Sequence, residues 1–162
     1  VNPFLVRTIC IYAIGCVVNM TIEDSSRIVP HYCSTWALAE EAGKSINTIL
    51  FSDSSTKPIT SDKHATATHA HLHALIEAMR AVAQQKSEQF PTPVEFCLYT
   101  TSESAVTILT QSQEKIADKS FISLQRTAIH LMSMVRNSSQ RSSIKSFLTH
   151  HPSSCKSQEY TT

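Results

Sequence analysis

A cluster of histidines is the densest group of potentially reactive side chains in this sequence. His64, His69, His71 and His73 fall within ten residues. On a helix, His69 and His73 would lie four residues apart on one face, and Glu77 would continue the stripe one turn further. Imidazole and carboxylate groups in this arrangement suit zinc or nickel. Because the stripe lies opposite an apolar face, the alternative is a polar, solvated face that holds no functional metal.

A second candidate is the corner LYTTSESAVTIL, residues 98–109. An apolar strand runs into a polar cluster and then into a helix, for which Ser102 and Glu103 suit the first turn. Such a corner usually presents a carboxylate at the end of the strand. Here Thr100 and Thr101 precede Ser102 instead, which indicates the shape of an active site without its acid.

Other common catalytic patterns are missing. With only two glycines, Gly15 and Gly43, the chain has no nucleophile elbow, phosphate-binding loop or dinucleotide fingerprint. Its five cysteines are scattered and include no CxxC pair, so we expect mostly buried free thiols and an intracellular, reducing compartment. A nucleophilic pair of Cys16 or Cys33 with a histidine has no local support.

Length and charge set broad limits on partners. The 162 residues are expected to form one domain, 1–162, with no cofactor. A net charge of +1 gives no strong field for nucleic acid or membrane. The apolar segment 1–20 is interrupted by Arg7 and lacks a basic start, so we expect neither a transmembrane span nor a signal peptide, and no membrane partner.

Hydrophobic periodicity predicts the elements that must position these groups. Apolar and β-branched runs predict strands, and apolar residues at helical spacing predict helices. Residues 52–62, rich in Ser, Thr, Pro and Asp, are expected to form a loop. The expected strands are 7–18, 28–39, 46–52, 94–99 and 144–148, and the expected helices are 68–83, 102–110 and 116–135. The order β-β-β-α-β-α-α-β predicts an α/β fold with a mixed five-stranded sheet.

This order and several local patterns resemble the ribonuclease H family, particularly the domains of retroelement reverse transcriptases. HAHLHALIEAMRAV (69–82) resembles the family's A-E-L-x-A-L-x-x-A helix, and LYTTSESAVTIL resembles Y-T-D-S-x-x-A-V-x-x-L. IYAIGC (11–16) resembles Y-T-D-G-S, and the tail 147–162 loosely resembles the family's last strand, loop and N-E-x-A-D ending. The resemblance spans nearly the whole chain.

The resemblance implies a nuclease whose four carboxylates hold two Mg²⁺ ions that cut the RNA strand of an RNA–DNA hybrid. Carried over residue by residue, the four acids become Ile14, His71, Thr101 and Thr162. None of these is an acid, so the resemblance predicts a degenerate domain without two-metal hydrolysis. A rival alignment takes Asp53 in FSDSST as an acid. It leaves too few residues before His71 for two strands, so Asp53 and Asp62 are expected to cap turns.

The sequence therefore predicts a catalytically inactive ribonuclease H-like domain, not an enzyme, acting as a structural or interaction module. Its partner would be a protein or a larger assembly, such as a reverse-transcriptase-derived polypeptide or a ribonucleoprotein. One alternative is a domain that binds RNA or an RNA–DNA hybrid without cleaving it. That alternative would use basic residues of the second half: Arg80, Lys86, Lys115, Lys119, Arg126 and Arg136. The other alternative is a metal-dependent enzyme built on His69, His71 and His73.

Overall fold

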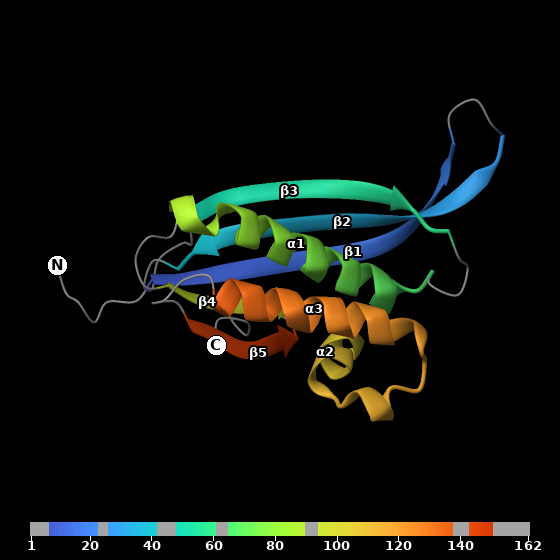
Figure 1. The fold of residues 1–162 in the computed structure, drawn as a ribbon. Helices are drawn as coiled ribbons and strands as arrows, with labels where there is room; N and C mark the ends of the chain where they lie inside the picture. The colour runs from blue at the N-terminus through green and yellow to red at the C-terminus, as the bar shows by residue number, and fades with distance from the viewer. Residues whose placement is uncertain are drawn as a thin grey trace.

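The chain forms a mixed α/β fold, seen in a computed structural model that describes residues 7–22, 26–41, 48–60, 65–89, 94–137 and 143–150. Three strands come first and the helices follow (Figure 1). The order of elements confirms the predicted fold class. The elements are β1 (Arg7–Thr21), β2 (Ile28–Glu40), β3 (Thr48–Pro58), α1 (Ala67–Gln89), β4 (Val94–Thr100), α2 (Glu103–Thr110), the short 3-10 helix η2 (Gln113–Lys115), α3 (Ser120–Asn137) and β5 (Ser143–His150).

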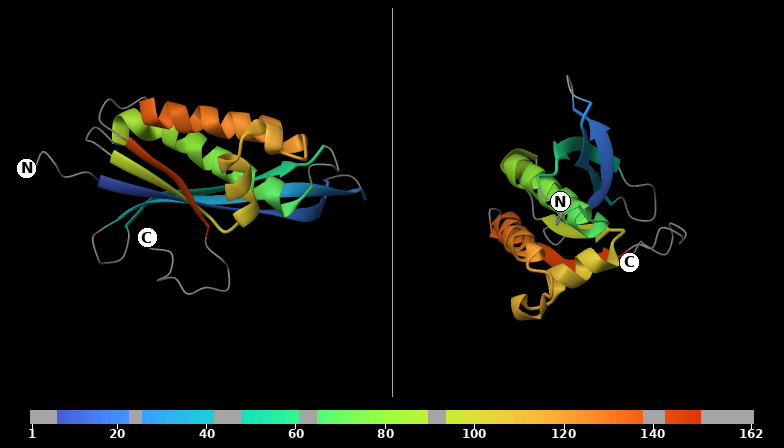
Figure 2. Two further views of the ribbon diagram at one scale, coloured as in Figure 1. Left: turned by 90° about the horizontal axis from the view of Figure 1, so that it is seen from below. Right: turned by 90° about the vertical axis from the view of Figure 1, so that its right-hand side faces the viewer.

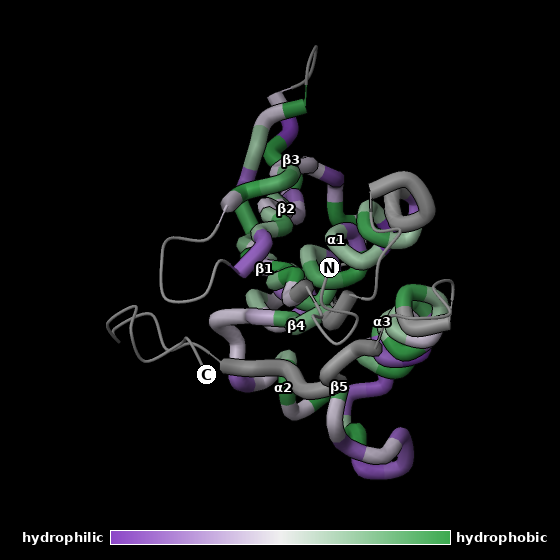
Figure 3. The backbone as a smooth tube through the Cα atoms, turned by 90° about the vertical axis from the view of Figure 1, so that its left-hand side faces the viewer, coloured by the Kyte–Doolittle hydropathy of each residue, from purple (hydrophilic) through white to green (hydrophobic). Residues whose placement is uncertain are grey.

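The sheet has the strand order β3-β2-β1-β4-β5. β1 pairs antiparallel with β2, and β2 with β3, whereas β4 runs parallel to both β1 and β5. Helices α1 and α3 lie on one face of this sheet (Figure 2, left), and Figure 3 shows them on the same side of the row of strands. Among the described residues, no helix is long and apolar enough to cross a membrane.

Strand β1 lies at the centre of the sheet and separates two environments. Ile9, Ile11 and Ala13 are essentially buried among the core residues, together with side chains of α1. The alternate residues Tyr12 and Ile14 point to the opposite face and are exposed, because successive side chains of a strand leave it on opposite sides. β1 therefore supplies both the core and an open surface.

Helix α1 is buried on two sides because it packs on the sheet and α3 lies beside it (Figure 3). It contacts β1 and β2 on one side and α3 on the other. Leu72, Leu75, Met79 and Val82 are at most 1% exposed, and these are the residues whose spacing predicted the helix. The sequence predicted that α1 buries only its apolar face. In the structure α1 also buries a second face, which packs against α3.

The ends of α2 and α3 are fixed by polar side chains. Ser102 caps α2, and its Oγ accepts a hydrogen bond from the N–H of Ala105 at 3.1 Å, as the corner pattern predicted. Asp118 Oδ1 accepts from the N–H of Ser120 at 3.0 Å at the start of α3. α3 begins at Ser120, whereas the sequence predicted a start at residue 116.

Candidate functional site

The predicted corner lies where the pairing between the parallel strands β1 and β4 ends: β4 stops at Thr100, whereas β1 continues to Thr21. Their register places Ala13 opposite Thr100. The next residues along the two strands, Ile14 and Thr101, are therefore neighbours. Ile14 is 53% exposed and Thr101 is half-buried, so solvent reaches both.

His71 joins this pair from α1. The N–H of Gly15 donates a hydrogen bond to His71 Nδ1 at 3.2 Å, which ties the helix to β1 next to Ile14. The structure thus brings close together three of the four positions that the resemblance aligns with metal-binding acids. The fourth, Thr162, lies outside the described residues, as does His64.

Gly15 allows the close approach of α1 to β1. A Cβ built at this position would lie 2.0 Å from the carbonyl oxygen of Ala70 and 2.3 Å from its carbon. No L-amino acid with a side chain fits there unless the helix moves away. In the Y-T-D-G-S pattern the glycine falls on Gly15, the residue at this close contact.

The hydrogen bond from Gly15 defines the state of the His71 ring. Because Nδ1 accepts this bond, the neutral ring carries its proton on Nε2. Burial lowers the pKa of His71 below its ordinary value of 6.5, since a charged imidazolium loses hydration there. His71 is therefore neutral at pH 7, and a neutral imidazole is a poor replacement for a carboxylate that holds Mg²⁺.

This state predicts a loss of stability in acid. A lowered pKa in the folded protein means that the unfolded chain binds the proton more tightly. Stability is then fully present above about pH 6.5, the pKa of an exposed histidine, and decreases as the pH falls toward the folded pKa of His71. We expect the melting temperature to drop between about pH 7.5 and pH 5. His71→Gln, whose side-chain oxygen can accept from Gly15 but cannot titrate, should show a smaller drop. Equal drops in circular-dichroism melts would contradict the assignment.

The surface around Ile14 is apolar and open. Tyr12 stacks on Tyr99 with ring centroids 5.0 Å apart. Ile14 is 53% exposed on this surface. Ala13 and Gly15 face α1, so Ile14 must face the other side of the sheet, which no described helix covers (Figure 2, left).

His69 does not lie on a solvated face, contrary to the prediction. It is 0% exposed because α3 packs over it, and its ring stacks on Phe121 at 4.1 Å. Ser120 Oγ donates to Asp118, so it accepts from His69 Nε2 at 2.7 Å. The other ring nitrogen, Nδ1, bonds to the hydroxyl of Thr66. Both nitrogens therefore have protein partners, and Ser120 is not activated as a nucleophile.

The other two predicted ligands also have partners of their own. His73 stacks on Tyr32 with ring centroids 4.3 Å apart. Glu77, 10% exposed, accepts a hydrogen bond from Ser55 and forms a 2.9 Å ion pair with Lys57. In the part of the chain that the structure describes, no three His, Cys, Asp or Glu side chains gather closely enough to hold a metal ion. His73 and Glu77 of the stripe therefore connect α1 to β2 and β3.

Asp53 lies in strand β3, not in the predicted loop. β3 continues through residues 52–58 because its register with β2 persists to Pro58. Asp53 is opposite Trp36, which is in turn opposite Ala13 of β1. A whole strand therefore separates Asp53 from the corner, and the rival alignment does not bring it to the candidate site.

The cysteines divide into two kinds. Cys10 and Cys97 are buried, as predicted, beside Tyr99. Cys16 is exposed and Cys33 is half-buried, so the expectation of burial was wrong for these two. Alternation puts Cys10 and Cys16 on the same face of β1. They differ because Cys10 lies opposite Cys97 of β4, whereas Cys16 lies beyond Ala13, where the pairing with β4 ends.

The basic residues proposed for nucleic acid lie on the helical side of the molecule. Lys115 is exposed on η2, and Lys119 is exposed just before α3 begins. Arg126 is exposed on α3 and Arg80 on α1. For Lys86 and Arg136 only the backbone is described, in α1 and α3.

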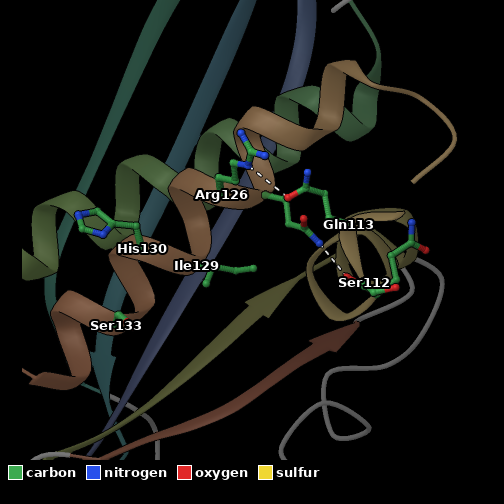
Figure 4. Close-up of a pocket in the computed structure, with 8 residues that line it drawn as sticks. Ser112, Gln113, Arg126, Ile129, His130 and Ser133 are labelled. Atoms are coloured by element: carbon green, nitrogen blue, oxygen red, sulfur yellow. Dashed lines mark hydrogen bonds between the residues drawn. The ribbon is translucent and has the colours of Figure 1, made fainter. Parts of the chain in front are cut away.

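An open groove of about 520 Å³ lies between η2 and α3 (Figure 4). Arg126 Nε donates to Gln113 Oε1 across it at 3.2 Å. Gln125 Nε2 donates to the carbonyl oxygens of Ile108 and Gln111 at 3.0 and 2.8 Å, which ties α3 to the end of α2. None of the corner residues lines this groove, so it is separate from the candidate site.

Solved structures with a similar fold include ribonucleases H. The chain resembles RNase H1 of Halobacterium salinarum NRC-1 with a TM-score of 0.52 and 18% identity, covering 90% of this chain and 86% of that one. It resembles LC11-RNase H1, isolated from compost by a metagenomic approach, with a TM-score of 0.55 and 17% identity, covering 90% and 85%.

The fold also occurs within a longer viral chain. The protease-reverse transcriptase of prototype foamy virus matches with a TM-score of 0.51 and 15% identity over 94% of this chain and 19% of the viral one. No protein-family model and no curated protein matches the sequence. At these identities the likeness shows the fold alone: the chain has a ribonuclease H-like fold.

Proposed function

We propose that this chain is a ribonuclease H-like domain that lacks two-metal nuclease activity and serves as a structural or interaction module. One observation carries the proposal: the corner that corresponds to the metal site holds Ile14, His71 and Thr101. Hydrolysis by two Mg²⁺ ions requires charged oxygen ligands around both ions. These three residues do not fit such a pair of ions.

Each of the three residues fails as a ligand for a physical reason. Ile14 has no donor atom, and the neutral hydroxyl of Thr101 supplies no charge. His71 uses Nδ1 to accept from Gly15 and is kept neutral by burial. The site therefore lacks the negative charge that offsets the desolvation of a divalent cation.

The module would belong to a larger polypeptide or ribonucleoprotein. The foamy virus protein supports this part of the proposal, because its similar fold is one portion of a much longer chain. An intracellular, reducing compartment remains part of the same proposal.

Incubation with a labelled RNA–DNA hybrid tests the absence of nuclease activity. With excess Mg²⁺, and then Mn²⁺, we expect no cleavage above the metal-free background, while an active RNase H1 cuts the same hybrid completely. His71→Ala serves as the matched control for contamination. Cleavage by the natural sequence that disappears in His71→Ala would overturn the proposal, because it would make His71 a catalytic residue.

A second candidate function is hybrid or RNA binding without cleavage. The exposed cations Lys115, Lys119 and Arg126 around the start of α3 favour it. Binding through phosphates would weaken steeply with salt. In a fluorescence-anisotropy titration, the triple alanine variant of these residues should reduce the salt slope by roughly one for each phosphate that the protein no longer neutralises. If the protein does not bind the hybrid even at low salt, this second candidate is excluded and the protein-interaction module is the function that remains.

A further inference from the structure

We propose that Cys16 and Cys33 form a dithiol site that a low-molecular-weight disulfide converts reversibly into a Cys16–Cys33 disulfide across strands β1 and β2. This site is independent of the proposed function, because neither cysteine occupies a position of a metal-binding acid.

The register of the antiparallel pair places the two cysteines opposite each other. Cys16 of β1 pairs with Cys33 of β2, between the pairs Gly15–Ser34 and Val17–Tyr32. Directly opposed residues of antiparallel strands have Cα atoms about 4.5 or 5.5 Å apart. Both distances lie within the range of about 4.4–6.8 Å that disulfides span. The backbone therefore needs little movement to close the bond.

The two thiols already interact. Burial, followed by the neighbouring Cys33 thiol, raises the pKa of the Cys16 thiol. Cys33 Sγ also lies 3.9 Å from the hydroxyl of Thr56 on β3. Both cysteines are free thiols, so the structure represents the reduced state of the site.

Exposure suggests an order of events. Cys16 is exposed, so its thiolate can attack one sulfur of an external disulfide and displace the other as a thiol. Cys33, half-buried beside it, then attacks the Cys16 sulfur of the mixed disulfide and displaces the second thiol. The protein gives up two electrons and two protons, and the reagent becomes two thiols. Because Cys16 must first ionise, the rate should rise with pH.

A second pair of cysteines provides an internal control. Cys10 and Cys97 are opposite each other across the parallel strands β1 and β4. They are only 3% and 4% exposed, and burial raises the pKa of Cys10. Access and ionisation are both unfavourable there, so this pair should stay reduced in the folded protein.

Oxidised glutathione is the probe for the test, used on the full chain with Cys155→Ser, because Cys155 lies outside the described residues and its thiol would compete. Intact mass should show the loss of two hydrogen atoms and no retained glutathione. Non-reducing tryptic digestion should link peptide 8–27 to peptide 28–44. The further change Cys10→Ser should keep this link, which assigns it to Cys16.

Single variants and melting complete the test. Cys16→Ser and Cys33→Ser should lose the internal bond and retain at most one glutathione each. The oxidised parent should melt higher than the reduced one, on the order of 5 °C for a loop of this length. Glutathione adducts without an internal bond, a Cys10–Cys97 link, or oxidation only in denaturant would each overturn the proposal.

Discussion

Gly15→Ala is expected to destabilise the domain by about 3 kcal/mol or more, the upper range for a side chain forced into a packed interior. An exchange of glycine for alanine in a strand normally stabilises by about 0.4–1 kcal/mol, because the unfolded chain loses freedom. Here the new Cβ would lie 2.0 Å from the carbonyl oxygen of Ala70. The steric clash outweighs the entropic gain, because the backbone of α1 cannot rotate away as a side chain can.

Urea unfolding measures this effect directly. Trp36 is the single tryptophan and is 7% exposed, so its fluorescence should report loss of the core. Asn19→Ala, at an exposed position of the same strand, serves as control and should change stability by less than about 1 kcal/mol. A Gly15→Ala protein as stable as the control would mean that α1 does not approach β1 this closely.

The sequence predicted the order of elements because local patterns and the fold agree along most of the chain. Ser102 illustrates this agreement: a polar residue between an apolar strand and an apolar helix predicted a cap, and its hydroxyl accepts from Ala105. The spacing of Leu72, Leu75 and Met79 predicted α1 for the same reason. Each signal depends on residues within about one turn of one another.

The failures arise where distant elements decide the environment. His69 was expected on a solvated face because its own helix has an apolar face elsewhere. Only the packing of α3, which places Ser120 and Phe121 against the ring, makes the position buried. Residues 52–58 were expected in a loop from their composition, yet pairing with β2 continues through them. Strand pairing is a tertiary property that local polarity does not encode.

The candidate site was only partly predictable in the same sense. The motifs identified Ile14, His71 and Thr101 by their places in the chain. The bond from the Gly15 N–H to His71 Nδ1 depends on how closely α1 approaches β1, and the two partners are 56 residues apart in the chain, so no local signal predicts it. The facing of Cys16 and Cys33 likewise follows from the register of a hairpin and not from their spacing.

The three residues at the corner carry no negative charge, which affects the stability of the fold. Clustered carboxylates repel one another when no metal is bound. With Ile14, neutral His71 and Thr101 that repulsion is absent, and the Gly15 N–H retains an acceptor in His71. The scaffold can therefore keep its fold without a divalent cation, which an acid-bearing site tolerates less well.

Placing three acids at this corner should make the stability of the domain depend on a divalent cation. The triple variant Ile14→Asp, His71→Glu and Thr101→Asp should melt lower than the natural protein without metal, because three negative charges gather at one corner. Adding Mn²⁺ or Mg²⁺ should raise its melting temperature. At a hundred times the dissociation constant, binding stabilises by about 2.7 kcal/mol, or roughly 5–10 °C for a domain of this size. The natural sequence should show no such shift.

The matched control replaces the same residues by neutral groups of similar shape: Ile14→Asn, His71→Gln and Thr101→Asn. It should bind no metal, because amide oxygens supply ligands without the charge that a divalent cation requires. A melting shift in the control equal to that of the acid variant would assign the effect to nonspecific binding of the cation. A metal shift confined to the acid variant would show that the three carboxylates together create a cation site at this corner. That result would support the proposal that the side chains at this corner account for the absence of two-metal hydrolysis.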